Sequence, residues 1–124
     1  MFDILFWIYL VNSVLLINHE IDSAYWKEWE LFKIPGGISG FLIMHLPLLF
    51  IVLYGLVLVF QQSFAGLILS LALSAGGIFA FTIYTIFIKK GRSEFKVPIS
   101  LFLLVATLLA SVIQAGITIY LLIT

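Results

Sequence analysis

Both histidines of this chain lie near a group of carboxylates, a combination that can bind a metal ion or carry protons. His19 belongs to the segment NHEIDSAYWKEWELFKIPGG, residues 18–37, and His45 lies in the apolar segment that follows. Two imidazoles and one carboxylate can bind zinc or iron and leave a coordination position open for water or substrate. The predicted ligand-binding residues are His19, Glu20, Asp22, Trp26, Glu28 and His45, and the predicted ligands of a divalent metal ion are His19, Asp22 and His45.

The familiar metal-enzyme patterns are absent around these histidines. The zinc-protease pattern H-E-x-x-H fails because Ser23 stands where the second histidine is required. The di-iron pattern Glu-x-x-His fails because Leu16 and Leu42 precede the two histidines by three positions. We therefore assign no catalytic residue and leave open whether the chain is an enzyme.

Two other interpretations of the histidines stay open beside the ligand pocket. In the first, His45 makes a hydrogen bond to Asp22, Tyr25 or a backbone carbonyl and only stabilises a helical hairpin. The protein is then a non-catalytic membrane module that oligomerises. In the second, the titratable side chains carry protons, and the protein is a subunit of a small proton-coupled transporter.

The composition indicates that most of this chain is surrounded by lipid. Of its 124 residues, 64% are hydrophobic and 10% are charged, whereas soluble domains are about 45–50% apolar and about 25% charged. The formal net charge is zero, so no basic surface suggests a nucleic-acid partner. Cysteine is absent, which excludes disulfides and thiolate metal ligands.

Four apolar segments reach the length of about 20 residues that a membrane-spanning helix needs. The predicted helices cover about residues 2–31, 38–60, 64–88 and 97–123. Because no proline or glycine interrupts the first one, it is expected either to run on into water or to bend and lie in the membrane interface. Continuous apolar runs favour helices over the alternating strands of a barrel. We predict an all-α fold: a polytopic membrane protein built as an antiparallel bundle of four transmembrane helices, in one domain, residues 1–124.

The Pro-Gly-Gly turn at residues 35–37 folds the first two helices against each other. Since a helix rises about 1.5 Å per residue, His45 comes level with Ser23 of the first helix, and His19 and Asp22 lie within one turn of that level. A buried ionisable side chain in a membrane helix needs a partner. For His45, we predict that this partner is Asp22 or His19.

The basic residues predict the orientation of the bundle. They all lie in the two connections on one face of the predicted bundle: Lys27, Lys33, Lys89, Lys90, Arg92 and Lys96. Because basic residues are retained on the cytoplasmic side of a membrane, both termini are predicted to lie outside.

Small residues recur at every fourth position in the last two helices, and such spacing lets helix backbones approach closely. The residues are Gly66, Ser70 and Ser74, then Ala72, Gly76 and Ala80, and finally Ala106 and Ala110. Helix packing explains this spacing, and the alternative is a ligand slot lined by small residues. The stripes exceed what one short bundle needs, so we predict a homo-oligomer in the lipid bilayer.

The block HEID…YWKEWELF…PGG, followed by MHLPLLF, resembles a family of small bacterial four-helix membrane proteins with no assigned function. The resemblance covers the first two helices and their connection, about half of the chain. It rests on His19, Glu20, Asp22, Trp26, Glu28, Trp29, Glu30, Gly36, Gly37 and His45. It implies a multi-pass protein of the bacterial inner (plasma) membrane and brings no activity with it.

In size and number of helices, the chain is also similar to the small multidrug resistance family. That family carries an essential glutamate in the middle of its first helix, where this chain has Asn12 and Ser13. The acidic residues here lie at the inner end of the helix instead. This difference argues against drug–proton exchange of the kind found in that family.

Overall fold

The computed structural model describes residues 1–91 and 97–124, and every regular element in this part of the chain is an α-helix. In chain order the elements are α1 (Phe2–Tyr25), α2 (Glu28–Leu31), α3 (Gly37–Phe60), α4 (Phe64–Lys89) and α5 (Pro98–Ile123). All except the short α2 are long and apolar enough to cross a membrane. The predicted all-α fold with four membrane-spanning helices is therefore confirmed.

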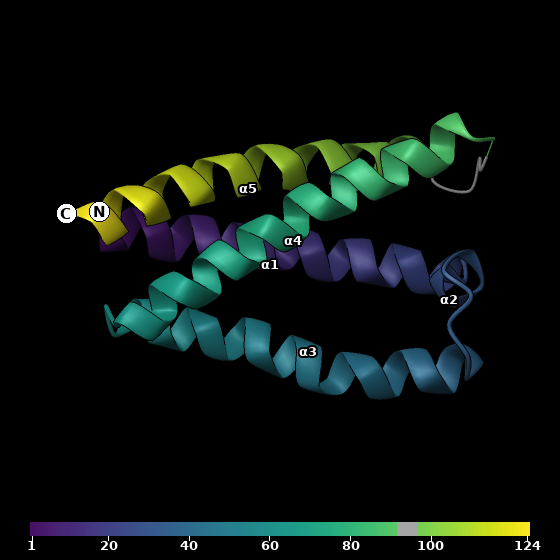
Figure 1. Cartoon of the computed structure of the whole chain (residues 1–124), viewed down its shortest axis with the longest axis horizontal. Coiled ribbons are helices and arrows are strands. Elements are labelled where there is room, and N and C mark those ends of the chain that lie inside the picture. The colour runs from purple at the N-terminus through teal and green to yellow at the C-terminus, as the bar shows by residue number, and fades with distance from the viewer. Residues whose placement is uncertain (92–96) are drawn as a thin grey trace.

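The four long helices form a ring in which α1 and α4 each pack against both α3 and α5. Both termini lie at one end of the bundle and α2 lies at the other end (Figure 1). The turn at residues 61–63 joins α3 to α4, and from this turn the two helices diverge toward the α2 end (Figure 1). This divergence positions the site described below.

The first helix ends earlier than predicted. One helix was expected over about residues 2–31, but α1 stops at Tyr25, and Lys27, with a left-handed φ of 57°, separates it from α2. Tertiary packing explains the break, because Trp26 and the end of α2 pack against the buried Tyr84 of α4. No proline or glycine marks this position, so the sequence carried no local signal for it.

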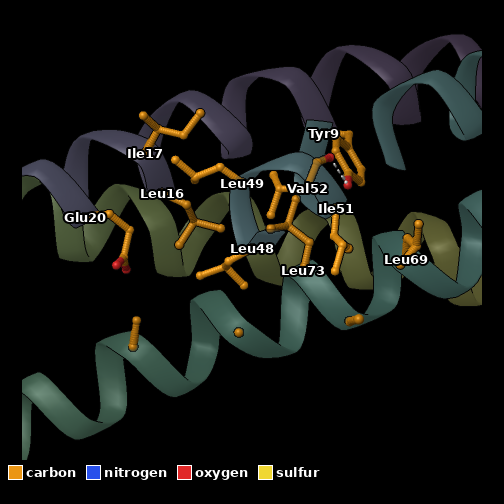
Figure 2. A pocket seen from close by; sticks show the side chains of 13 residues that line it. Tyr9, Leu16, Ile17, Glu20, Leu48, Leu49, Ile51, Val52, Leu69 and Leu73 are labelled. Atoms are coloured by element: carbon orange, nitrogen blue, oxygen red, sulfur yellow. Dashed lines mark hydrogen bonds between the residues drawn. The ribbon is translucent and has the colours of Figure 1, made fainter. Parts of the chain in front are cut away.

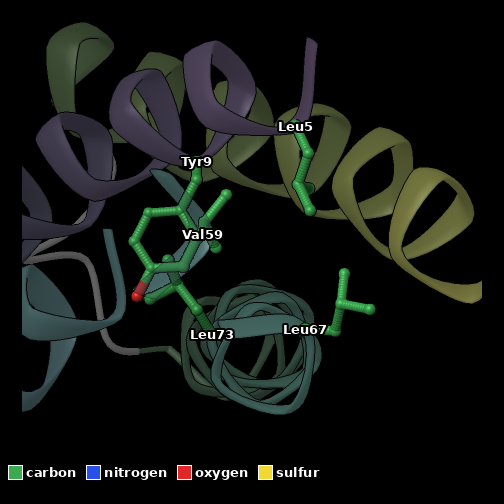
Figure 3. Close-up of a cluster of buried hydrophobic side chains, with 5 residues drawn as sticks. All are labelled: Leu5, Tyr9, Val59, Leu67 and Leu73. Carbon is green, nitrogen blue, oxygen red and sulfur yellow. The ribbon is translucent and has the colours of Figure 1, made fainter. Parts of the chain in front are cut away.

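Apolar packing is concentrated at the end of the bundle that holds the termini. The side chains of Leu5, Tyr9, Val59, Leu67 and Leu73 form a buried cluster from α1, α3 and α4 (Figure 3). The hydroxyl of Tyr9 donates a hydrogen bond of 2.6 Å to a backbone carbonyl of α3, so its polar end has a partner. We call these five residues the terminal cluster, and they pack α1, α3 and α4 together in this part of the bundle.

The first stripe of small residues in α4 packs inside the chain. Gly66, Ser70 and Ser74 are all buried. A Cβ atom at Gly66 would lie 2.6 Å from the carbonyl carbon of Leu58, so glycine lets α3 and α4 meet directly after their turn. Because these residues are already used within one chain, they do not by themselves argue for contact between chains. The homo-oligomer stays a prediction.

Replacing Gly66 with alanine is expected to destabilise the fold. The added methyl overlaps backbone atoms of α3, and relieving such overpacking costs about 1–3 kcal/mol. The matched control is Gly116→Ala in α5, where an added Cβ meets nothing within 4 Å and alanine favours the helix by up to about 1 kcal/mol. Thermal unfolding in one detergent measures both, and equal midpoints for the two variants would contradict the close approach at Gly66.

Candidate ligand site

A histidine–glutamate pair joins α3 to α1 near the α2 end of the bundle. The Nε2 atom of His45 contacts Oε2 of Glu20, and its Nδ1 atom lies 2.8 Å from the carbonyl oxygen of Phe41. The imidazole also stacks on the ring of Phe41, with 3.9 Å between the ring centroids. The side chain of His45 is 8% exposed and that of Glu20 is 25% exposed. The imidazole is therefore fixed on three sides, while the carboxylate keeps an open side.

These contacts give both nitrogens of the His45 imidazole a polar partner. A carbonyl oxygen only accepts hydrogen bonds, so Nδ1 of His45 donates to the carbonyl oxygen of Phe41. Nε2 of His45 faces Oε2 of Glu20 on the neighbouring helix. A buried ionisable side chain in a membrane helix needs such a partner, and this contact links α3 to α1.

A second carboxylate reaches the same region from α2. Glu28 accepts a hydrogen bond from Tyr84 of α4, and the Tyr84 hydroxyl also lies 3.3 Å from Oγ of Ser23 in α1. Burial raises the pKa of Glu28, and the nearby charge of Glu20 raises it further. Hydrogen bonds from Tyr84 and Ser23 and the charge of His45 oppose this shift only in part, so the pKa of Glu28 stays above its ordinary value.

The raised pKa of Glu28 predicts a pH-dependent stability. Between the pKa of Glu28 in the unfolded chain and its higher pKa in the folded protein, the folded state binds more protons. The free energy of unfolding therefore falls as pH rises through this interval. Glu28→Gln has no such proton to lose, so above the folded-state pKa it should unfold at a higher temperature than the wild type. In acid, below the unfolded-state pKa, the difference should disappear.

Thermal unfolding from about pH 4, near the ordinary pKa of glutamate, to about pH 8 measures this effect. The matched control is Glu30→Gln, which neutralises an exposed carboxylate of the same short helix. Wild type and Glu28→Gln with parallel pH curves would contradict the assignment of the raised pKa to Glu28.

Two of the predicted site residues lie away from His45. Asp22 accepts a hydrogen bond of 3.0 Å from Nε1 of Trp26, one turn further along the chain. His19 is 1% exposed, and its ring packs edge-on against the ring of Tyr84, 4.7 Å between centroids. The expected partner of His45, Asp22 or His19, was therefore wrong, and the partner is Glu20. Each residue turns a helix by about 100°, so His19 faces α4 whereas its neighbour Glu20 faces α3.

The structure does not form the predicted metal site. Across residues 1–91 and 97–124, no group of three or more His, Cys, Asp or Glu side chains is arranged to hold a metal ion. The three expected ligands, His19, Asp22 and His45, instead contact three different neighbours, which are Tyr84, Trp26 and Glu20. A carboxylate–imidazole pair remains, and the divalent metal has no support from this geometry.

A narrow cavity lies between α1, α3 and α4, and we call it the α3–α4 slot. Its volume is about 250 Å³, and Glu20 lies at one end of it while Tyr9 lies toward the other (Figure 2). Apart from these two residues the lining side chains are apolar, with Leu16, Leu49 and Val52 among them. The slot therefore presents one carboxylate to a space that is otherwise almost wholly hydrocarbon.

The second stripe of small residues in α4 lines this slot. Ala72, Gly76 and Ala80 face it, and a Cβ atom added at Gly76 would meet nothing within 4 Å. Both interpretations of the small residues therefore apply in α4, because one stripe packs against neighbouring helices and the other leaves space. The spacing alone could not tell these two faces apart.

Sequence reasoning missed Tyr84 and Ser23 as members of the polar group around Glu28. Their approach depends on α2 bending back over the bundle after Lys27, which no local signal predicts. Trp26, in contrast, does lie beside Asp22, as helical spacing would suggest.

Comparison with known proteins gives a family and no closer relative. Residues 5–121 match the model of one protein family, described as a family of unknown function, DUF6713. No curated protein and no solved structure matches the chain. The matched region contains every residue of the site described above.

Proposed function

The chain belongs to the DUF6713 family, whose function is unknown, and we propose that it is a membrane protein whose α3–α4 slot binds a small lipophilic molecule with a basic head group. One observation carries the proposal: a carboxylate, Glu20, stands at the end of an otherwise almost wholly apolar slot. The tail of such a ligand occupies the apolar part, and its head group lies at Glu20.

The lining of the slot selects an apolar tail. Its volume of about 250 Å³ is just below the range of about 300–1,000 Å³ that is usual for drug-sized ligands, so one short chain or a small ring fits. The hydroxyl of Tyr9 already donates to the carbonyl oxygen of Val52. The rest of the wall offers a ligand apolar contact and little else.

The chemistry of Glu20 selects a head group that donates hydrogen bonds and carries positive charge. His45 occupies Oε2, and the described residues place no hydrogen-bond donor on the other carboxylate oxygen. An ionised carboxylate only accepts hydrogen bonds. The charge of Glu20 raises the pKa of the nearby Glu28, so a cation bound at Glu20 also lies close enough to interact with this second acid. An alkylammonium ion meets both requirements.

The location of the site follows from the basic residues around it. Lys27 and Lys33 lie in the segments that flank α2, and Lys89 and Lys90 lie at the end of α4, all at the α2 end of the bundle. Basic residues favour the cytoplasmic side. Arg92 and Lys96, which contributed to the same prediction, fall outside the described residues. We therefore propose a bacterial inner-membrane protein with both termini outside and the Glu20 end of the slot toward the cytoplasm.

A calorimetric titration tests the proposal, with n-octylamine added to the protein in lipid nanodiscs. n-Octanol and octanoate are the matched probes, because they keep the tail and change only the head group. We expect saturable binding of the amine, weaker binding of the alcohol and no specific binding of the acid. Equal uptake of all three probes would show simple partition into lipid and would contradict the proposal.

A further inference from the structure

The α3–α4 slot extends from the inside of the bundle to its outer surface. On α4, the slot is lined by Leu73, which is buried, and also by Ala72 and Gly76, which are exposed. On α3, the lining residues Leu48 and Ile51 are 44% and 50% exposed. Because exposed residues of both helices line the slot, it opens outward between α3 and α4.

The arrangement of the helices explains this opening. α3 and α4 diverge after the turn at residues 61–63 (Figure 1), and Leu16 and Ile17 of α1 form the inner wall of the space between them. α5 packs against α1 and α4 and lies across the ring from α3. The outer surface between two membrane-spanning helices faces lipid chains, so the opening connects the slot with the hydrocarbon of the bilayer.

The slot also has the length and direction of a lipid chain. Glu20 lies at one end and Tyr9 toward the other (Figure 2), and these two residues of α1 are about three helical turns, or about 16 Å, apart. The hydrocarbon core of a bilayer is about 30 Å thick, so the slot is about as long as one leaflet is deep. Because α1 is long and apolar enough to cross the membrane, a tail that follows it lies parallel to the neighbouring lipid chains.

We propose that the ligand is a membrane amphiphile, a long-chain alkylamine, which enters the slot sideways from the bilayer between α3 and α4. This inference rests on the proposed function, because it keeps the basic head group at Glu20. The tail runs from Glu20 toward Tyr9, and a tail longer than the slot continues through the opening into lipid. Since the tail moves from lipid into another apolar environment, it adds little affinity, and the head group decides which amphiphile binds.

Photolabelling of the wild-type protein in lipid nanodiscs tests this route. The probe is n-hexadecylamine with a photoreactive diazirine in the middle of its tail, and the matched probe is the corresponding alcohol. Mass spectrometry then locates the labelled residues. We expect the amine probe to label the opening at Leu48, Ile51 or Ala72, and excess n-octylamine to remove this label. Label at the exposed Leu109 and Val112 of α5 reports contact with bulk lipid and should stay unchanged.

The possible results distinguish the lateral route from the proposed function. If n-octylamine binds saturably in calorimetry but the opening is unlabelled, or keeps its label in excess n-octylamine, the lateral route is overturned and the proposed function stands. If n-octylamine shows no saturable binding, both are contradicted. Equal labelling of the opening by the amine and alcohol probes, removed equally by n-octylamine, would overturn the amine as the ligand class.

Discussion

Replacing His45 with alanine is expected to lower the free energy of unfolding more than any other single change in the site. The imidazole contacts both the carboxyl group of Glu20 and the carbonyl of Phe41, so its loss leaves an acid without its partner between two membrane helices. Breaking a buried pair costs about 3–5 kcal/mol in soluble proteins. Because the Glu20 side chain is 25% exposed, we expect a loss toward the lower end of that range.

A double-mutant cycle separates the pair from its surroundings. His45→Ala and Glu20→Ala should be strongly coupled, so that the double variant loses less stability than the sum of the two single variants. Asp22→Ala is the matched control on the same helix, since Asp22 bonds to Trp26, and its effect should nearly add to that of His45→Ala. Additive losses for His45 and Glu20 would show that their contact does not stabilise the fold.

The second large effect is expected on ligand binding. Glu20→Gln keeps the size of the side chain, and its amide oxygen can still accept a hydrogen bond from His45. It removes the charge that holds an ammonium head group. A hydrogen bond to a charged group contributes about 1.5–3 kcal/mol, so the affinity for n-octylamine should fall by about 10- to 150-fold.

Calorimetric titration in nanodiscs measures this loss, with Glu30→Gln as a control that removes an exposed carboxylate from α2. Binding of n-octanol should change little in Glu20→Gln, because a neutral head group gains little from the charge. An unchanged affinity for the amine would mean that its head group does not lie at Glu20.

The architecture was predictable because it depends on long stretches of sequence. Four continuous apolar segments can satisfy their backbone groups in lipid only as helices, and the Pro-Gly-Gly turn determines which residues of α1 and α3 lie level. That argument placed His45 beside the end of α1 that leads into α2, where the structure has it. Neither the number of helices nor the height of His45 along α1 depended on a single residue. An error of one or two residues in a predicted helix end therefore left both conclusions unchanged.

The partner of His45 was not predictable by the same argument. Comparing the positions of residues along the two helix axes predicts which turn of α1 lies beside His45. The contact itself depends on which side of that turn faces α3. His19 and Glu20 differ by one residue and by about 100° around the helix, and they face different neighbours. The rotation of α1 is determined by the packing of all four helices, which one sequence does not show.

The slot and the group around Glu28 depend on tertiary structure to a still greater degree. Ala72, Gly76 and Ala80 have the spacing of a packing stripe, and only the divergence of α3 from α4 turns this face into a cavity. Glu28 meets Tyr84 because the chain reverses at Lys27 in a left-handed conformation. Both features arise from the fit between helices and have no counterpart in local sequence preference.

The most direct test of the central claim is to fill the slot without touching its charged end. Gly76 lines the slot, and a Cβ atom added there meets nothing within 4 Å, so Gly76→Leu places its side chain in the space proposed for the tail. Gly116→Leu is the matched control, because an added Cβ there also meets nothing and Gly116 does not line the slot. Titrated with n-octylamine in nanodiscs, Gly76→Leu should lose saturable binding while Gly116→Leu binds like the wild type. Undiminished binding by a folded Gly76→Leu protein would contradict a ligand site in the α3–α4 slot.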